Sequence, residues 1–188
     1  EILALEVDTI QHTRNLAAPP IPLVHFAHGG AEAIPAEEAS IDIVLMFKSL
    51  HHVPVPLMDQ ALNEISRVLK PGGIAWISEP VYAGEFNDIL RLFHDEKEVR
   101  EKAFAAICHA VDSGHLALEK QLFFNTRSQF DDFEQFDTRM IRVTHSNHAL
   151  SPALYETVRT QFAAHLGPTG ATFFNPQRVD VLGKPAST

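Results

Sequence analysis

Hydrophobic residues fall into runs and stripes that predict a β-α-β unit in the middle of the chain. "SIDIVLMF" (40–47) is a nearly continuous apolar run of strand length, typical of a parallel strand covered on both faces. In 57–69, apolar residues recur every three or four positions and predict one buried helix face. "KPGG" (70–73) then ends this helix and leads into a second apolar strand, "GIAWISEP" (73–80). Two strands joined by a helix predict a right-handed crossover and a parallel sheet.

The first residues repeat this order. Ile2–Leu5 predicts a short buried strand that ends at Glu6. Asp8 is a suitable N-cap for a helix, which Pro19 and Pro20 would stop because proline cannot continue a helix. A brief second strand is predicted near 23–26.

Beyond Pro80 the pattern becomes mainly helical. Residues 84–122 contain no strand-like run and predict helices, and "TRSQFDDFEQF" (126–136) predicts a short helix with Phe130 and Phe133 on one face. "DTRMIRVTH" (137–145) alternates like a half-exposed strand. "SPALYETVRTQFAAHLG" (151–167) predicts a helix with Leu154, Val158, Phe162 and Leu166 on one face, and "QRVDVLGKP" (177–185) a last strand. We expect one domain, 1–188, with a helical insertion at about 84–122.

Composition limits the function. The formal net charge of −9 repels phosphate backbones, so a nucleic-acid partner is disfavoured and a small molecule favoured. Apolar runs fall short of the ~20 residues of a membrane helix, which predicts no membrane partner. The single cysteine, Cys108, fits a reducing cytoplasm and is expected to lie in the core.

Four segments resemble one family in unbroken order: Gly29 to Pro35, Ile41 to Phe47, Leu50 to Val53 and Arg67 to Gly73. Linked motifs at matching spacing are more specific than any one alone. They resemble the class I S-adenosylmethionine-dependent methyltransferases that act on small molecules. The resemblance implies an α/β fold with a Rossmann-like, doubly wound, mostly parallel sheet, helices on both faces, the helical insertion after the fifth family strand, and an antiparallel strand near the C-terminus.

The resemblance also implies S-adenosyl-L-methionine as cofactor and a small-molecule methyl acceptor. Glu6 would accept hydrogen bonds from both ribose hydroxyls, as acids at strand ends do in dinucleotide-binding folds. At the adenine, the family's acid is replaced by Gly30, so a side-chain bond to the adenine is lost while a backbone N–H can still reach the ring. Glu32 would either compensate for the lost acid or be solvated on a surface loop. The implied cofactor residues are Glu6, Val7, Gly30, Ala31, Glu32, Met46, Phe47 and Lys48.

Some side chains near these motifs are open to several roles. Lys48 would meet the methionyl carboxylate, an acidic substrate or solvent, because a sulfonium repels it. His51 and His52 diverge as neighbours, which argues against a metal, although either is a candidate general base. Tyr82 is a third catalytic candidate. Together with Glu79 and Pro80 it is expected to line the substrate site, with the helices that follow as a lid or as ordinary packing.

One family element has no counterpart. The family's first strand and its glycine-rich loop precede the strand that ends at Glu6, and these 188 residues contain no such loop. Its place would lie between the strands at 2–6 and 41–47. We therefore expect an N-terminal segment that was cut off or is disordered, or a strand supplied by a second copy in a homodimer.

Two other functions stay open. A methyltransferase-like protein without activity would serve as a binding or assembly module, which the replaced acid at Gly30 favours. An NAD-dependent oxidoreductase would use Glu6 on its own ribose, although the glycine fingerprint of such enzymes is missing.

Overall fold

A computed structural model describes residues 1–142 and 149–185. The chain divides into two compact units, and each is described by itself. The first comprises Glu1–Ser78, Lys102–Gln121 and the chain from Asp180 onward, and the second comprises Glu79–Glu101 and Leu122–Val179. Four elements cross these boundaries and contribute residues to both units: β4 (Leu69–Pro80), α4 (Lys97–Asp112), β5 (Ala117–Phe130) and β7 (Gly170–Gly183).

The first unit begins with a small parallel sheet. β1 (Ile2–Glu6) and β2 (Val24–His28) pair in register, with Glu6 opposite His28, and α1 (Thr9–Ala17) connects them. Asp8 caps α1 as predicted, since its Oδ1 accepts from the backbone N–H of Ile10 at 2.8 Å. None of the residues of α1 is buried.

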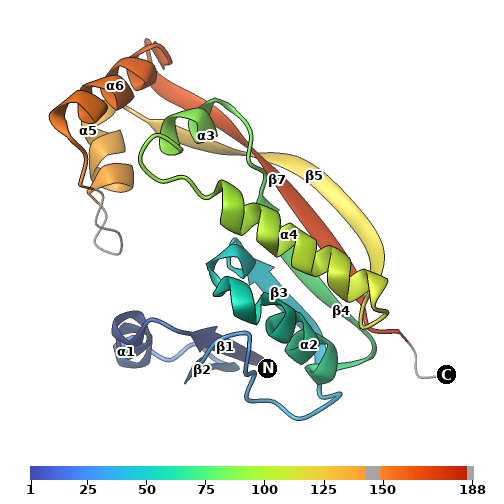
Figure 1. Cartoon of the computed structure of the whole chain (residues 1–188). Helices are drawn as coiled ribbons and strands as arrows, with labels where there is room; N and C mark the ends of the chain where they lie inside the picture. The colour runs from blue at the N-terminus through green and yellow to red at the C-terminus, as the bar shows by residue number, and fades with distance from the viewer. Residues whose placement is uncertain (143–148, 186–188) are drawn as a thin grey trace. The chain divides into compact units, whose positions relative to one another are not determined.

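The predicted β-α-β unit forms the core of the first unit. β3 (Ile41–Phe47) and β4 (Leu69–Pro80) are parallel, and α2 (Met58–Val68) joins them after two short 3₁₀ turns, η1 (Leu50–His52) and η2 (Val55–Leu57). Figure 1 shows α2 beside α4 (Lys97–Asp112). Their apolar residues share one buried cluster with β3 and β4, which includes Leu62, Ile65, Ile107 and Ile77.

The prediction that both faces of β3 are covered is wrong for the part of the chain that the structure describes, because one face is exposed. Ile43, Leu45 and Phe47 alternate along the strand, and each side chain is more than half exposed, whereas Met46 on the opposite face is 6% exposed. The pairing of β3 with β4 shifts register at the "KPGG" segment: Ile41 pairs with Leu69, before this segment, and Ile43 pairs with Ile74, after it. Gly72 has φ +78°, a conformation that suits glycine.

The larger sheet has the strand order β3-β4-β7-β5, with β6 on β7. β5 spans Ala117–Phe130, β7 spans Gly170–Gly183, and β6 (Leu166–Gly167) pairs antiparallel with β7. Parallel pairs joined by helices, with an antiparallel strand near the C-terminus, are the predicted Rossmann-like α/β arrangement.

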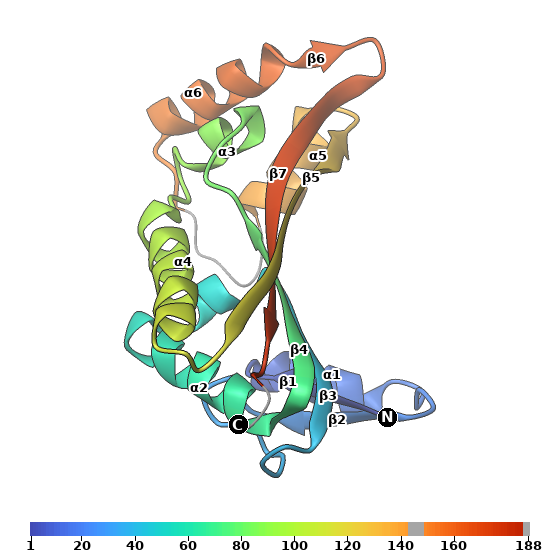
Figure 2. The ribbon, with the colours of Figure 1, turned by 90° about the vertical axis from the view of Figure 1, so that its right-hand side faces the viewer.

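The second unit is built around phenylalanines. Figure 2 shows α3 (Glu85–Leu90), α5 (Phe133–Phe136) and α6 (Pro152–Ala163) gathered around β5 and β7. Phe130, Phe136, Phe162 and Phe173 are each at most 1% exposed and contact one another in T-shaped or tilted pairs. This cluster forms a hydrophobic core separate from that of the first unit.

Several predictions in the C-terminal half are wrong. β5 begins at Ala117, so residues 84–122 are not entirely helical. Most side chains of β5 are exposed, which explains why its sequence contains no apolar run that would predict a strand. Phe130 lies in β5 and Phe133 in the four-residue α5. The segment Asp137–Ile141, predicted as a strand, is a π-helix, η3; the end of that prediction, 143–145, lies outside the described residues.

Two further differences concern single residues. α6 begins with Ser151 as its cap, as predicted, but ends at Ala163, so Leu166 lies in β6 and is 44% exposed. Cys108 is exposed on α4, which contradicts its predicted place in the core. Among the described residues, none of the helices combines the length and apolar character needed to cross a membrane.

Candidate functional site

The carboxyl ends of β1 and β2 bring the first group of predicted residues together. Glu6 is half-buried at the end of β1, and its backbone oxygen accepts from the Gly29 N–H at 3.1 Å. The Glu6 carboxylate itself accepts from the Asp8 N–H at 2.9 Å, which leaves its second oxygen available to a ligand. Val7 is exposed, and its carbonyl lies 3.2 Å from His28 Nε2.

The loop after β2 carries Gly30, Ala31 and Glu32. The Glu32 carboxylate folds over Gly30 so closely that a Cβ at position 30 would overlap with it. A carboxylate therefore occupies the space that an acidic side chain at position 30 would take. Ala31 packs against the core of the first unit, which fixes the backbone of this loop.

An ion pair on α2 holds the same loop. Arg67 donates to Glu64 at 2.7 Å and also to the backbone oxygens of Ala36 at 2.8 Å and Ile34 at 3.0 Å. Glu64 accepts from the Ile34 N–H at 3.1 Å, and Gln60 donates to the Glu32 carbonyl at 2.8 Å. The hydrogen bond from Arg67 lowers the pKa of Glu64 and that from Glu64 raises the pKa of Arg67.

We call Arg67, Glu64 and Gln60 the loop clamp. Sequence reasoning missed it, and named Arg67 only as the first residue of a segment that resembles the family. The i,i+3 spacing of Glu64 and Arg67 on a predicted helix is compatible with an ion pair. Their backbone partners lie about thirty residues earlier in the chain, and no sequence motif marks them.

The carboxyl ends of β3 and β4 hold the second predicted group. The Met46 side chain is buried in the core, so only its backbone is available to a ligand, whereas Phe47 is 63% exposed. Lys48 has φ +53°, uncommon for a residue with a side chain, and its N–H donates to the Ser78 carbonyl at 2.7 Å. This bond fixes the turn and leaves the Lys48 side chain exposed.

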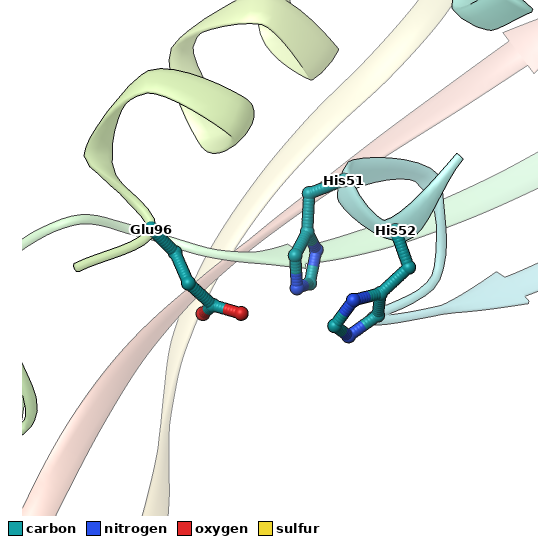
Figure 3. A group of neighbouring side chains, drawn as sticks. All are labelled: His51, His52 and Glu96. Carbon is teal, nitrogen blue, oxygen red and sulfur yellow. The ribbon is translucent and has the colours of Figure 1, made fainter. Parts of the chain in front are cut away.

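His51 and His52 form part of η1, directly after this turn. His51 is 5% exposed, and the two ring centroids lie 4.1 Å apart, so the rings do not diverge as predicted. Figure 3 shows the two side chains. The figure also draws Glu96, an acid of the second unit whose carboxylate pairs with Arg100 at 2.6 Å and with His94 at 3.0 Å. Of the two histidines, only His52 is exposed to solvent.

The remaining candidates belong to the second unit. Glu79 is 3% exposed, and Pro80 and Tyr82 are half-buried. Burial and a hydrogen bond to Asp95 raise the pKa of the Tyr82 hydroxyl. Tyr82 is therefore protonated at neutral pH and suits donating a hydrogen bond better than accepting a proton.

Comparisons with known proteins agree with the first unit's architecture. Residues 3–77 match the model of a family described as a methyltransferase domain. A probable S-adenosylmethionine-dependent methyltransferase of Mycolicibacterium smegmatis is 35% identical over 83 residues, which are 42% of this chain and 29% of that protein. A ubiquinone/menaquinone biosynthesis C-methyltransferase of Bartonella tribocorum is 44% identical over 52 residues, 28% of this chain and 19% of that protein. The chain thus spans less than a third of the length of these relatives.

Solved structures extend the similarity to the whole fold. The YcgJ protein of Bacillus subtilis superposes with a TM-score of 0.62 at 18% identity, over 100% of this chain and 83% of that one. A putative methyltransferase of Bacillus halodurans gives 0.63 at 15% identity, over 98% and 83%. At such identities the likeness concerns the fold alone.

Proposed function

We propose that this chain binds S-adenosylmethionine and methylates a small molecule. The proposal is supported by the match of residues 3–77 to a methyltransferase domain and by a relative, named as a probable S-adenosylmethionine-dependent methyltransferase, that is 35% identical over 83 residues. The observation that carries the proposal is the position of Glu6. Its carboxylate stands at the end of a parallel strand, with one oxygen available, beside the loop that follows β2. Carboxylates at this point of α/β sheets accept ribose hydroxyls.

The neighbouring loop fits an adenine ring. Gly30 carries no side chain, and the Glu32 carboxylate fills the space beside it, so Glu32 is the proposed acceptor for the adenine amino group. The loop clamp holds this backbone from α2 and so supports the position of Glu32. Val7, Ala31 and Phe47 are the proposed apolar contacts. At the end of β3, Met46 offers its backbone and Lys48 its exposed side chain.

Methyl transfer does not require a dedicated acid or base side chain in every case. When bound, S-adenosylmethionine supplies an electrophilic methyl group on a sulfonium. The residues of the protein need to bind, align the acceptor and exclude water, which can supply most of the rate enhancement. If the acceptor must lose a proton, His52 is the accessible candidate base in the first unit.

Calorimetric titration with S-adenosylhomocysteine tests the proposal, because this product analogue binds without the acceptor. We expect saturable binding and no saturable binding of NAD. Glu6→Ala should weaken binding at least about tenfold, since a hydrogen bond to a charged group contributes about 1.5–3 kcal/mol.

Glu98→Ala is the matched control, because it removes an exposed glutamate on α4, in the second unit. It should leave the affinity unchanged. Saturable binding of NAD in place of S-adenosylhomocysteine, or equal affinities of the parent and Glu6→Ala, would contradict the proposed cofactor site.

A further inference from the structure

The second unit contains a cavity that the proposed cofactor site does not use. It has a volume of about 610 Å³ and lies among α5, η3 and α6. Its wall includes Phe133, Glu134, Asp137, Arg142 and Tyr155. The cavity therefore combines aromatic surface with several charges.

Asp137 is the exceptional residue in this wall. It is 5% exposed, and its Oδ2 accepts from Arg142 Nε at 2.6 Å. Its Oδ1 is buried and accepts no hydrogen bond from any residue that the structure describes. A buried carboxylate oxygen without a donor is unfavourable, so a ligand that brings an N–H or O–H to it would gain affinity.

The local backbone keeps Asp137 and Arg142 on one wall. Arg142 donates its N–H to the Asp137 carbonyl at 2.9 Å, a bond between residues five apart that defines a π-helical turn. Such turns are rare in proteins, and those that occur are frequently found at functional sites. In η3 this turn lies between the capped α5 and the residues before α6.

The remaining wall favours a cation. Phe133 and Tyr155 meet edge to face with their centroids 5.5 Å apart, and the faces of such rings attract ammonium groups. Asp132 and Glu134 add negative charge to that of Asp137. Of the two arginines in the wall, Arg142 is paired with Asp137, and Arg159 lies 3.7 Å from Glu156.

We propose that this cavity binds a small organic amine as its ammonium ion. The ammonium group donates to Asp137 Oδ1, and the hydrocarbon part of the ligand lies against Phe133 and Tyr155. This site is independent of the proposed cofactor site, since it uses other residues and requires no methyl transfer.

The test compares three probes of similar size on the full chain at neutral pH: phenethylamine, 2-phenylethanol and 3-phenylpropanoate. Calorimetry should show saturable binding of phenethylamine and at least about tenfold weaker binding of the neutral and anionic probes. Backbone amide shifts caused by phenethylamine should concentrate at residues 132–138 and 155.

Asp137→Asn should remove the preference for the amine over the alcohol, whereas Asp112→Asn, at the exposed end of α4, should preserve it. Phe133→Leu keeps Asp137 and should weaken the amine several-fold, so it decides the matter if Asp137→Asn fails to fold. Equal binding of amine and alcohol, shifts located elsewhere, or no saturable binding of any probe would overturn the proposal.

Discussion

Two helices of the first unit are stabilised in different ways, one by a capping side chain and the other by a buried face. α1 has a capping side chain, Asp8, which accepts from two backbone N–H groups, yet it buries no residue. α2 has no capping side chain, but it buries Met58, Ala61, Leu62, Ile65 and Val68. Short helices derive most of their stability from packing. α2 should therefore be firmly folded, and α1 should depend on its cap.

This difference matters for function because the proposed cofactor contacts span both regions. Glu6 lies on the weakly packed β1–α1–β2 segment, whereas the loop clamp belongs to α2. A ligand that binds only the folded state stabilises it by mass action. Cofactor binding should thus stabilise the β1–α1–β2 segment more than the already packed β-α-β core.

The largest effect should come from a cavity in the packed region. Leu62 is fully buried, so Leu62→Ala should lower the free energy of unfolding by about 2–5 kcal/mol. Leu16→Ala on α1 is the matched control, because Leu16 is 61% exposed, and it should change the stability by less than about 0.5 kcal/mol. Urea denaturation measures both. Equal losses of stability in the two variants would contradict the difference in packing between α1 and α2.

A smaller effect should come from the helix caps. Ser151 caps α6, which buries Val158 and Phe162, so Ser151→Ala should lower global stability by about 0.5–2 kcal/mol. Asp8→Ala removes an equivalent cap from α1 and should reduce its helicity, measured by amide exchange of residues 10–14. Because α1 lacks a buried face, the global urea midpoint should barely move. A large shift of that midpoint would show that α1 is packed after all.

The smallest effect concerns the loop clamp and pH. The pKa of Glu64 is lowered in the folded state, mainly by its hydrogen bond from Arg67. Its contribution to stability is therefore complete above the ordinary pKa of a glutamate and is lost as the pH falls through the lowered value. Glu64→Gln should remove this part of the acid dependence in urea titrations. Identical pH profiles for parent and variant would exclude the ion pair as its source.

The first eighty residues were predictable because local signals and packing agree there. The three- and four-residue spacing of the apolar residues in α2 and the Asp8 cap each reflect the environment that these residues meet in the fold, whereas the continuous apolar run of β3 is buried on one face only. The place of Glu6 at a strand end followed from these elements, and Gly30 and Glu32 were assigned through the family resemblance. Val7, Met46 and Lys48 could be assigned to a region, but whether a side chain or backbone faces a ligand depends on tertiary contacts.

The C-terminal half was less predictable for physical reasons. β5 leaves most of the side chains of 117–129 exposed or half-exposed, so it lacks the apolar alternation of a covered strand. η3 has the alternation of a strand, but Asp137 and Arg142 close a π-helical turn through a backbone bond and an ion pair. The loop clamp binds backbone atoms about thirty residues earlier in the chain, and the cavity around Asp137 joins α5 and η3 to α6; no sequence motif marks either of them.

Amide hydrogen exchange with and without S-adenosylhomocysteine locates the cofactor site on the chain. We expect the ligand to protect the amides at residues 6–8, 29–32 and 47–49, whereas those of α2 and β4, already protected by packing, should change little. Protection that is absent from residues 6–8 and 29–32, or that appears only in the second unit, would contradict a cofactor site built from Glu6 and the clamped loop.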